Sequence, residues 1–137
     1  MAEGKVQFIS PQSVLRIHDE LLARYGGSRI PGHRSESEGV VAAVMAVRNS
    51  YYTDLFDLAA AYAVYIVMGH VFGDGNKRCA SGTALAFLAL NGVLAVPPVD
   101  SLLDLMVEVQ QLAESDPRPS ANQLVGFVST FLRSISG

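Results

Sequence analysis

The feature that most constrains this chain is a central stretch that is almost free of charge. Residues 55–99 hold only four formally charged side chains in 45 positions. Because charged groups are costly to bury unless they are paired or used, such a stretch predicts segments that are buried on nearly every side. Its two apolar runs, 58–68 and 84–90, are far shorter than the roughly 18–20 residues of a membrane-spanning helix. The stretch therefore predicts the interior of a soluble domain.

Composition narrows the class of protein further. The 137 residues predict a single domain over 1–137, and 50% hydrophobic against 17% charged residues argues against disorder. A net charge of −3 without a basic stripe makes direct nucleic-acid binding an unfavoured function. The single cysteine, Cys79, excludes an internal disulfide framework. No apolar run precedes the first proline, so we expect no signal peptide and a cytoplasmic protein.

The hydrophobic periodicity is helical almost throughout and predicts an all-α domain of about six helices. Ser10-Pro11 is typical of a helix start, and Ser120 with Gln123 has the spacing of a capping box. Thr53-Asp54 is expected to cap the third helix. The predicted helices cover about 11–25, a second that starts near 35 or 37, 55–68, 76–90, 101–114 and a last one from 120. The pair 55–68 and 76–90 is expected to form the buried centre.

Three of the four charges in the central stretch fall in one short loop, whose sequence is HVFGDGNKR (70–78). Gly73 and Gly75 allow tight turns and close approach of a ligand. The loop leads into a helix N-terminus, where backbone N–H groups and the helix dipole favour an anion such as phosphate. Lys77 and Arg78 oppose that dipole unless an anion compensates them. The pattern indicates a phosphate site.

The remaining polar residues of the loop supply the other parts of a transfer reaction. His70 is able to accept a proton from a hydroxyl near neutral pH, and Asp74 is a suitable ligand for Mg²⁺. Asn76 is expected to cap the helix or brace the loop, and Phe72 to anchor it in the core. Each residue alone is more often structural, but together they favour phosphoryl or nucleotidyl transfer to a hydroxyl. The loop is not a Walker motif.

The loop resembles the motif of the Fic/Doc family, H-x-F-x-[DE]-x-N-x-R. Lys77, which stands where most Fic proteins have glycine, resembles the death-on-curing (Doc) toxin branch. The resemblance extends over about residues 8–96. It implies the Fic fold, and it implies the toxin of a toxin–antitoxin pair that uses ATP and Mg²⁺ to phosphorylate a threonine of elongation factor Tu and so arrests translation.

The same resemblance implies a role for each residue of the loop. His70 would be the general base, and Asp74 would bind Mg²⁺. Phe72 would be structural. The nucleotide phosphates would be held by the side chains or backbone of Gly73, Gly75, Asn76, Lys77 and Arg78.

Two departures bear on which group is transferred. Adenylylating Fic enzymes typically have a second arginine where this chain has Ser81, and they have glycine in place of Lys77. Both differences favour transfer of the γ-phosphate, with AMP transfer as the alternative. A catalytically silent Fic-fold binding protein is a third hypothesis. A ribonuclease toxin is disfavoured because His18 and His33 are distant in sequence, and His18 falls on an apolar helical face typical of a satisfied core histidine.

Three further segments carry expectations. Residues 49–54 fall where the family has a flap that docks the target peptide by strand addition, so Tyr51, Tyr52 and Thr53 would line it, although the two tyrosines would equally cover the core edge. His33-Arg34-Ser35 replaces an Arg-Asp that is common in the family. The inhibitory pattern [ST]-x-x-x-E-[GN] is incomplete, since Glu38-Gly39 is present but Arg34 fills its first position. Inhibition is therefore expected from a separate antitoxin.

Overall fold

The computed structural model describes residues 5–26, 36–69, 71, 75–94 and 98–135, and within them the chain is helical with no strand. This confirms the predicted all-α fold. The helices, in chain order, are α1 (Pro11–Tyr25), α2 (Glu36–Arg48), α3 (Leu55–Met68), α4 (Asn76–Leu90), α5 (Val99–Ala113) and α6 (Ala121–Ile135).

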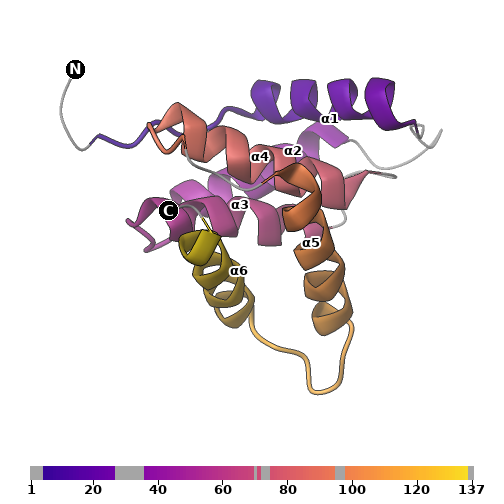
Figure 1. Cartoon of the computed structure of the whole chain (residues 1–137), viewed down its shortest axis with the longest axis vertical. Coiled ribbons are helices and arrows are strands. Elements are labelled where there is room, and N and C mark those ends of the chain that lie inside the picture. The colour runs from indigo at the N-terminus through magenta and orange to yellow at the C-terminus, as the bar shows by residue number, and fades with distance from the viewer. Residues whose placement is uncertain (1–4, 27–35, 70, 72–74, 95–97, 136–137) are drawn as a thin grey trace.

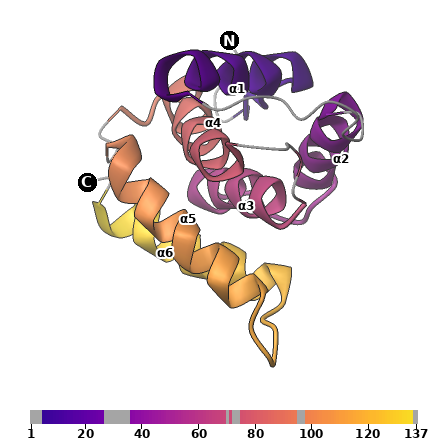
Figure 2. The ribbon, with the colours of Figure 1, turned by 90° about the vertical axis from the view of Figure 1, so that its right-hand side faces the viewer.

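Helices α3 and α4 form the centre of the molecule, and the other helices cover them. α1 packs on α4 and α2 packs on α3, as Figures 1 and 2 show. On the other side, α5 packs on α4 and α6 packs on α3, and the loop that joins them lies at the lower end of Figure 1. The central pair is thus covered from several directions, as its lack of charge predicts.

The bounds predicted for α3 and α4 are the observed ones. Every residue of α3 from Leu58 to Val64 is at most 1% exposed, and on α4 Phe87 and Leu88 are wholly buried. Alanines at 59–61, 63, 80 and 84 let the two backbones approach closely. None of the described helices is long and apolar enough to cross a membrane.

The helix starts follow the capping residues seen in the sequence. Ser10 Oγ accepts a hydrogen bond from the Ser13 N–H at 3.2 Å, and an Asp54 carboxylate oxygen accepts one from the Phe56 N–H at 2.9 Å. The capping box of α6 is reciprocal: Gln123 N–H donates to Ser120 Oγ at 3.1 Å, and Ser120 N–H donates to Gln123 Oε1 at 2.8 Å. α5 begins at Val99 rather than Ser101, because Pro98 is its N-cap and leads directly into the helix.

The segment before α1 is fixed against the central pair. The Ile9 N–H donates to the buried Tyr62 hydroxyl at 3.0 Å, and the Tyr62 ring lies 5.2 Å from that of Phe87. Gln7 and Asn91 exchange two hydrogen bonds, at 2.8 and 2.9 Å. These contacts pair backbone groups of the segment with side chains of α3 and of the end of α4.

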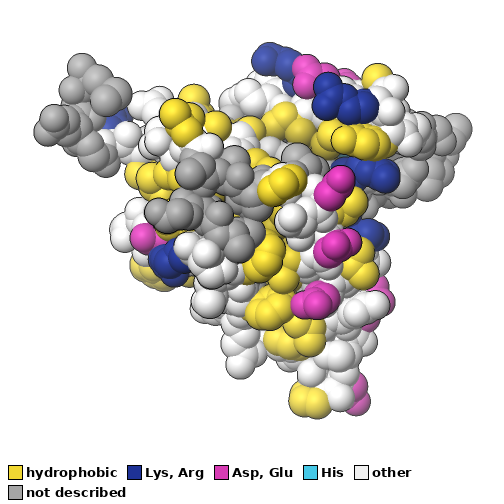
Figure 3. Space-filling model, viewed as in Figure 1, with side chains coloured by type: hydrophobic (Ala, Val, Ile, Leu, Met, Phe, Trp, Pro, Cys, Tyr) yellow, Lys and Arg dark blue, Asp and Glu magenta, His cyan; other side chains and the backbone are white. Residues whose placement is uncertain are grey.

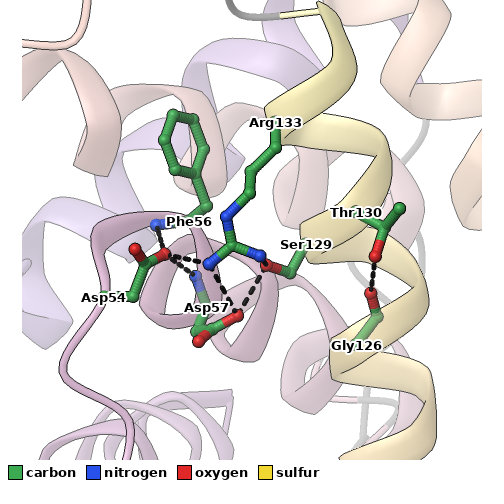
Figure 4. Close-up of polar contacts among 7 residues, drawn as sticks. All are labelled: Asp54, Phe56, Asp57, Gly126, Ser129, Thr130 and Arg133. Atoms are coloured by element: carbon green, nitrogen blue, oxygen red, sulfur yellow. Dashed lines mark hydrogen bonds and ion pairs between the residues drawn. The ribbon is translucent and has the colours of Figure 1, made fainter.

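A cluster of polar contacts ties α6 to the start of α3 (Figure 4). The Arg133 guanidinium pairs with Asp54 and Asp57, and it donates to Ser129 Oγ at 2.9 Å. The buried Ser129 hydroxyl donates to Asp57 Oδ1 at 2.6 Å. Asp57, one of the four charges of the central stretch, is thus paired and hydrogen-bonded at the edge of the core.

Burial of the single thiol predicts its reactivity. Burial raises the pKa of Cys79 from 9.0 to about 12. Because this pKa lies above that of the unfolded chain, the protonated thiol stabilises the fold below about pH 9, and that contribution is lost as the pH rises toward 12. We expect a disulfide reagent at pH 8 to label the native protein at least about a hundredfold more slowly than the urea-unfolded chain. Equal labelling rates would contradict the burial of Cys79.

Candidate active site

The predicted loop residues fall into two groups. His70, Phe72, Gly73 and Asp74 lie outside the described residues, as do His33, Arg34 and Ser35 of the departing segment. The structure places the other four, Gly75, Asn76, Lys77 and Arg78, at the first turn of α4.

Glycine at position 75 is required by the backbone of this turn. Gly75 is the N-cap of α4, with φ of +82° in the left-handed region. A Cβ there would lie 3.3 Å from Nε2 of His18 on α1. Asn76 is the first residue of the helix rather than its N-cap, so its predicted capping role is wrong, and the N-cap Gly75 has no side chain that could accept a hydrogen bond. The positive end of the α4 helix dipole, which favours an anion, lies at this turn.

His18 is 1% exposed, which confirms that it is a core histidine. It also packs against Gly75, at the turn that leads from the motif into α4. The helical spacing of α1 predicts that His18 faces inward, but no pattern in the sequence indicates which segment it meets.

Lys77 is held by a residue of α5. Its Nζ donates to Gln110 Oε1 at 2.9 Å, and Gln110 Nε2 donates to Glu114 Oε1 at 3.3 Å. Gln110 also borders an open cavity of about 510 Å³, together with Met68 at the end of α3 and Arg118. Through its hydrogen bond to Gln110, Lys77 is connected to a residue that lines this cavity.

Arg78 is held on the other side by α1. Its guanidinium carbon lies 4.8 Å from the centre of the Tyr25 ring, a cation–π contact. Lys77 and Arg78 are both partly exposed, so neither charge is lost in the core. The two cations of the motif thus have separate supports, Gln110 and Tyr25, from helices far apart in the sequence.

Position 81 carries no cation. Ser81 is fully buried, and its hydroxyl donates to the Lys77 carbonyl at 2.9 Å within α4. The site therefore has Lys77 and Arg78 in its first helical turn and no positive charge one turn further on.

These residues fit a phosphate better than they fit a metal. Backbone N–H groups at a helix N-terminus, a lysine and an arginine are donors that phosphate oxygens prefer. Among the residues that the structure describes, no three histidine, cysteine or acidic side chains gather to hold a metal ion. Asp74, the Mg²⁺ ligand predicted from the sequence, lies outside the described residues.

The predicted flap residues lie elsewhere. Thr53 shares a pocket with Leu90 and Asn91, at the end of α4 opposite to the motif. Tyr51 is fully exposed, whereas the Tyr52 hydroxyl donates to Asn122 Oδ1 at 2.6 Å, and burial raises the pKa of Tyr52. Among the described motif residues, Val71 and Gly75 to Arg78, none is hydrogen-bonded to these three residues. Their role in docking a target stays a prediction.

Gly39 of α2 has a structural reason for being glycine. A Cβ at this position would lie 3.2 Å from the buried side chain of Val71, inside the motif. The close approach of α2 to Val71 accounts for the glycine with which the incomplete inhibitory pattern ends.

The protein is an all-α domain in which the motif connects two buried helices, α3 and α4, and ends in two adjacent cations, Lys77 and Arg78. These features define the class of protein. The chain belongs to the Fic/DOC family, whose model matches residues 8–88. It is 39% identical over 89 residues to "Protein kinase doc" of Escherichia phage P1, which covers 64% of this chain and 71% of the relative. It is 39% identical over 80 residues to "Toxin Doc" of Mycolicibacterium smegmatis (strain ATCC 700084 / mc(2)155), covering 57% and 61%.

Proposed function

We propose that this chain is the toxin of a toxin–antitoxin system and that it transfers the γ-phosphate of ATP to a hydroxyl of a protein. The observation that carries the proposal is the intact family motif, whose two cations stand in the first turn of the buried helix α4. Family membership and the names of the two relatives, a toxin and a protein kinase, support the same function.

In this proposal each group has one task. Lys77, Arg78 and the N–H groups of the first turn of α4 would bind the nucleotide phosphates, with Gly73, Gly75 and Asn76 shaping that cradle. His70 would accept the proton of the target hydroxyl. Asp74 would hold Mg²⁺, which when bound neutralises charge on the transferring phosphoryl group.

Two features favour phosphoryl transfer over AMP transfer. Position 81 is occupied by a buried serine whose hydroxyl is already used within the helix, so the second arginine of the adenylylating enzymes has no counterpart there. Lys77 adds a charge where those enzymes have glycine. The arginine of the adenylylating enzymes is thus absent and Lys77 is added. The bound nucleotide would therefore present its γ-phosphate, rather than its α-phosphate, to the target hydroxyl.

The target and the inhibitor follow from the resemblance. We propose a threonine of elongation factor Tu as the acceptor, so that modification would arrest translation. Because the inhibitory pattern in α2 is incomplete, we propose that a separate antitoxin inhibits the chain in trans. Its capture together with this chain from the native operon would support that part.

The decisive experiment supplies ATP labelled at either the α- or the γ-phosphate to the chain together with elongation factor Tu. We expect label on the factor from the γ-position only, found on a threonine by mass spectrometry. Label retained from the α-position would establish AMP transfer and overturn the kinase assignment.

The His70→Ala variant separates an enzyme from a silent binding protein. We expect it to lose both growth arrest and label transfer while it still binds the antitoxin, because only the general base is removed. Growth arrest that persists in this variant would favour a toxin that acts by binding alone.

A further inference from the structure

We propose that Gln110 is a positioning residue for Lys77, which holds the ammonium group at the phosphate site without neutralising it. The inference rests on the proposed function. Gln110 lies on α5, outside residues 8–88 that match the family model, so the family motif does not assign it a role.

The contact joins two helices that are distant in sequence. Lys77 lies in the first turn of α4 and Gln110 lies in the last turns of α5, yet Nζ and Oε1 are 2.9 Å apart in a partly buried setting. A lysine side chain is long and flexible, with three N–H donors on its ammonium. One bond to Gln110 restrains that flexibility and leaves donors for a phosphate oxygen.

The orientation of the Gln110 amide is fixed by both of its neighbours. Its Oε1 faces the Lys77 ammonium and its Nε2 faces Glu114 Oε1, at 3.3 Å. The flipped amide would set its NH₂ group against an ammonium and its oxygen against a carboxylate, and both contacts would be repulsive. The hydrogen bond to Glu114 therefore determines that the amide oxygen of Gln110, and not its NH₂ group, faces Lys77.

Because the acceptor beside Lys77 is neutral, the positive charge of the ammonium group stays available to a phosphate. A carboxylate at position 110 would form an ion pair with Lys77 and cancel much of the attraction that a phosphate would feel. The amide instead separates the Lys77 ammonium from the carboxylate of Glu114. The chain thus places a hydrogen-bond acceptor, rather than a countercharge, beside a lysine that is proposed to bind an anion.

A purely structural role is the competing explanation. In that case the bond would only tie α4 to α5, and replacement of the amide by a carboxylate would keep or strengthen the tie. The substitution Gln110→Glu therefore gives opposite expectations: a structural tie predicts unchanged nucleotide binding, whereas a positioning role predicts weaker binding with the fold retained.

The test measures ATP binding to the full chain by titration calorimetry, with Mg²⁺ present. We expect Gln110→Glu to raise the Kd for ATP by about tenfold or more with an unchanged Tm. We expect Gln110→Met, which keeps the length but removes the acceptor, to raise Kd less, because the charge of Lys77 survives. In transfer assays the effect should appear in KM for ATP more than in kcat.

Gln111→Glu is the matched control. It adds the same charge to the same helix at an exposed position, and Asp100, Asp104 and Glu108 of that helix are exposed as well. Figure 3 shows acidic side chains along this part of the surface. We expect its Kd to stay within about twofold of the unmodified chain. Equal Kd values for the Gln110→Glu and Gln111→Glu variants would overturn the inference alone. Absence of ATP binding by the unmodified chain would overturn the proposed function and the inference with it.

Discussion

Replacement of Arg78 by alanine is expected to lower label transfer from γ-labelled ATP by about 10²–10³-fold, the usual loss when one donor to a developing charge is removed. Arg78 stands in the first turn of α4, next to Lys77, with its guanidinium over the Tyr25 ring. Its planar fork is able to bind two phosphate oxygens at once, which a point charge cannot reproduce. We therefore expect Arg78→Lys to recover only part of the activity.

The loss in Arg78→Ala should be catalytic rather than structural. A partly exposed cation–π contact contributes about 0.5–1 kcal/mol, so the free energy of unfolding should change by no more than about that amount. Arg24→Ala is the matched control, because it removes an exposed positive charge from the last turn of α1, beside Tyr25, and should leave transfer unchanged. Transfer by Arg78→Ala at the rate of the control would remove Arg78 from the site.

The elements of this fold could be predicted because their signals are local. Ser10, Asp54 and Ser120 each cap a helix within three residues of themselves, and the charge-free stretch marks α3 and α4. The sequence predicts the start of α5 at Ser101, two residues after the observed start at Val99. A proline N-cap lacks the side-chain signal that serine and aspartate give.

The supports of the site could not be predicted in the same way. Tyr25 meets Arg78 across 53 residues, and Gln110 meets Lys77 across 33. Such pairs depend on how whole helices cross, and no periodicity within one helix encodes the partner. The sequence therefore identifies the chemical groups of the motif, while the structure identifies what holds them.

The scarcity of charge in the central stretch now has a physical explanation. Asp57 pairs with Arg133, Lys77 bonds to Gln110 and Arg78 stacks on Tyr25. Each of these three charges lies in the first turn of its helix and contacts a side chain from another helix. Charges placed deeper along α3 or α4 would have mostly apolar neighbours, which accounts for their absence there.

The largest expected effect on stability is that of Phe87→Ala, at about 3–5 kcal/mol of unfolding free energy. Phe87 is completely buried on α4, and its ring lies 5.2 Å from that of Tyr62 on α3 and 6.4 Å from that of Phe8. Removal of the ring leaves a cavity where α3, α4 and the N-terminal segment meet. Urea denaturation followed by circular dichroism measures the change.

Phe127→Ala on α6 is the control, because it removes the same ring from a position that is 40% exposed. We expect it to lower the free energy of unfolding by less than about 1.5 kcal/mol, since much of that ring is already in water and no closed cavity forms. Comparable losses in the two variants would contradict the placement of Phe87 at the junction of the central helices. If Phe87→Ala leaves too little folded protein to measure, Phe87→Leu keeps part of the volume and should lie between the two alanine variants.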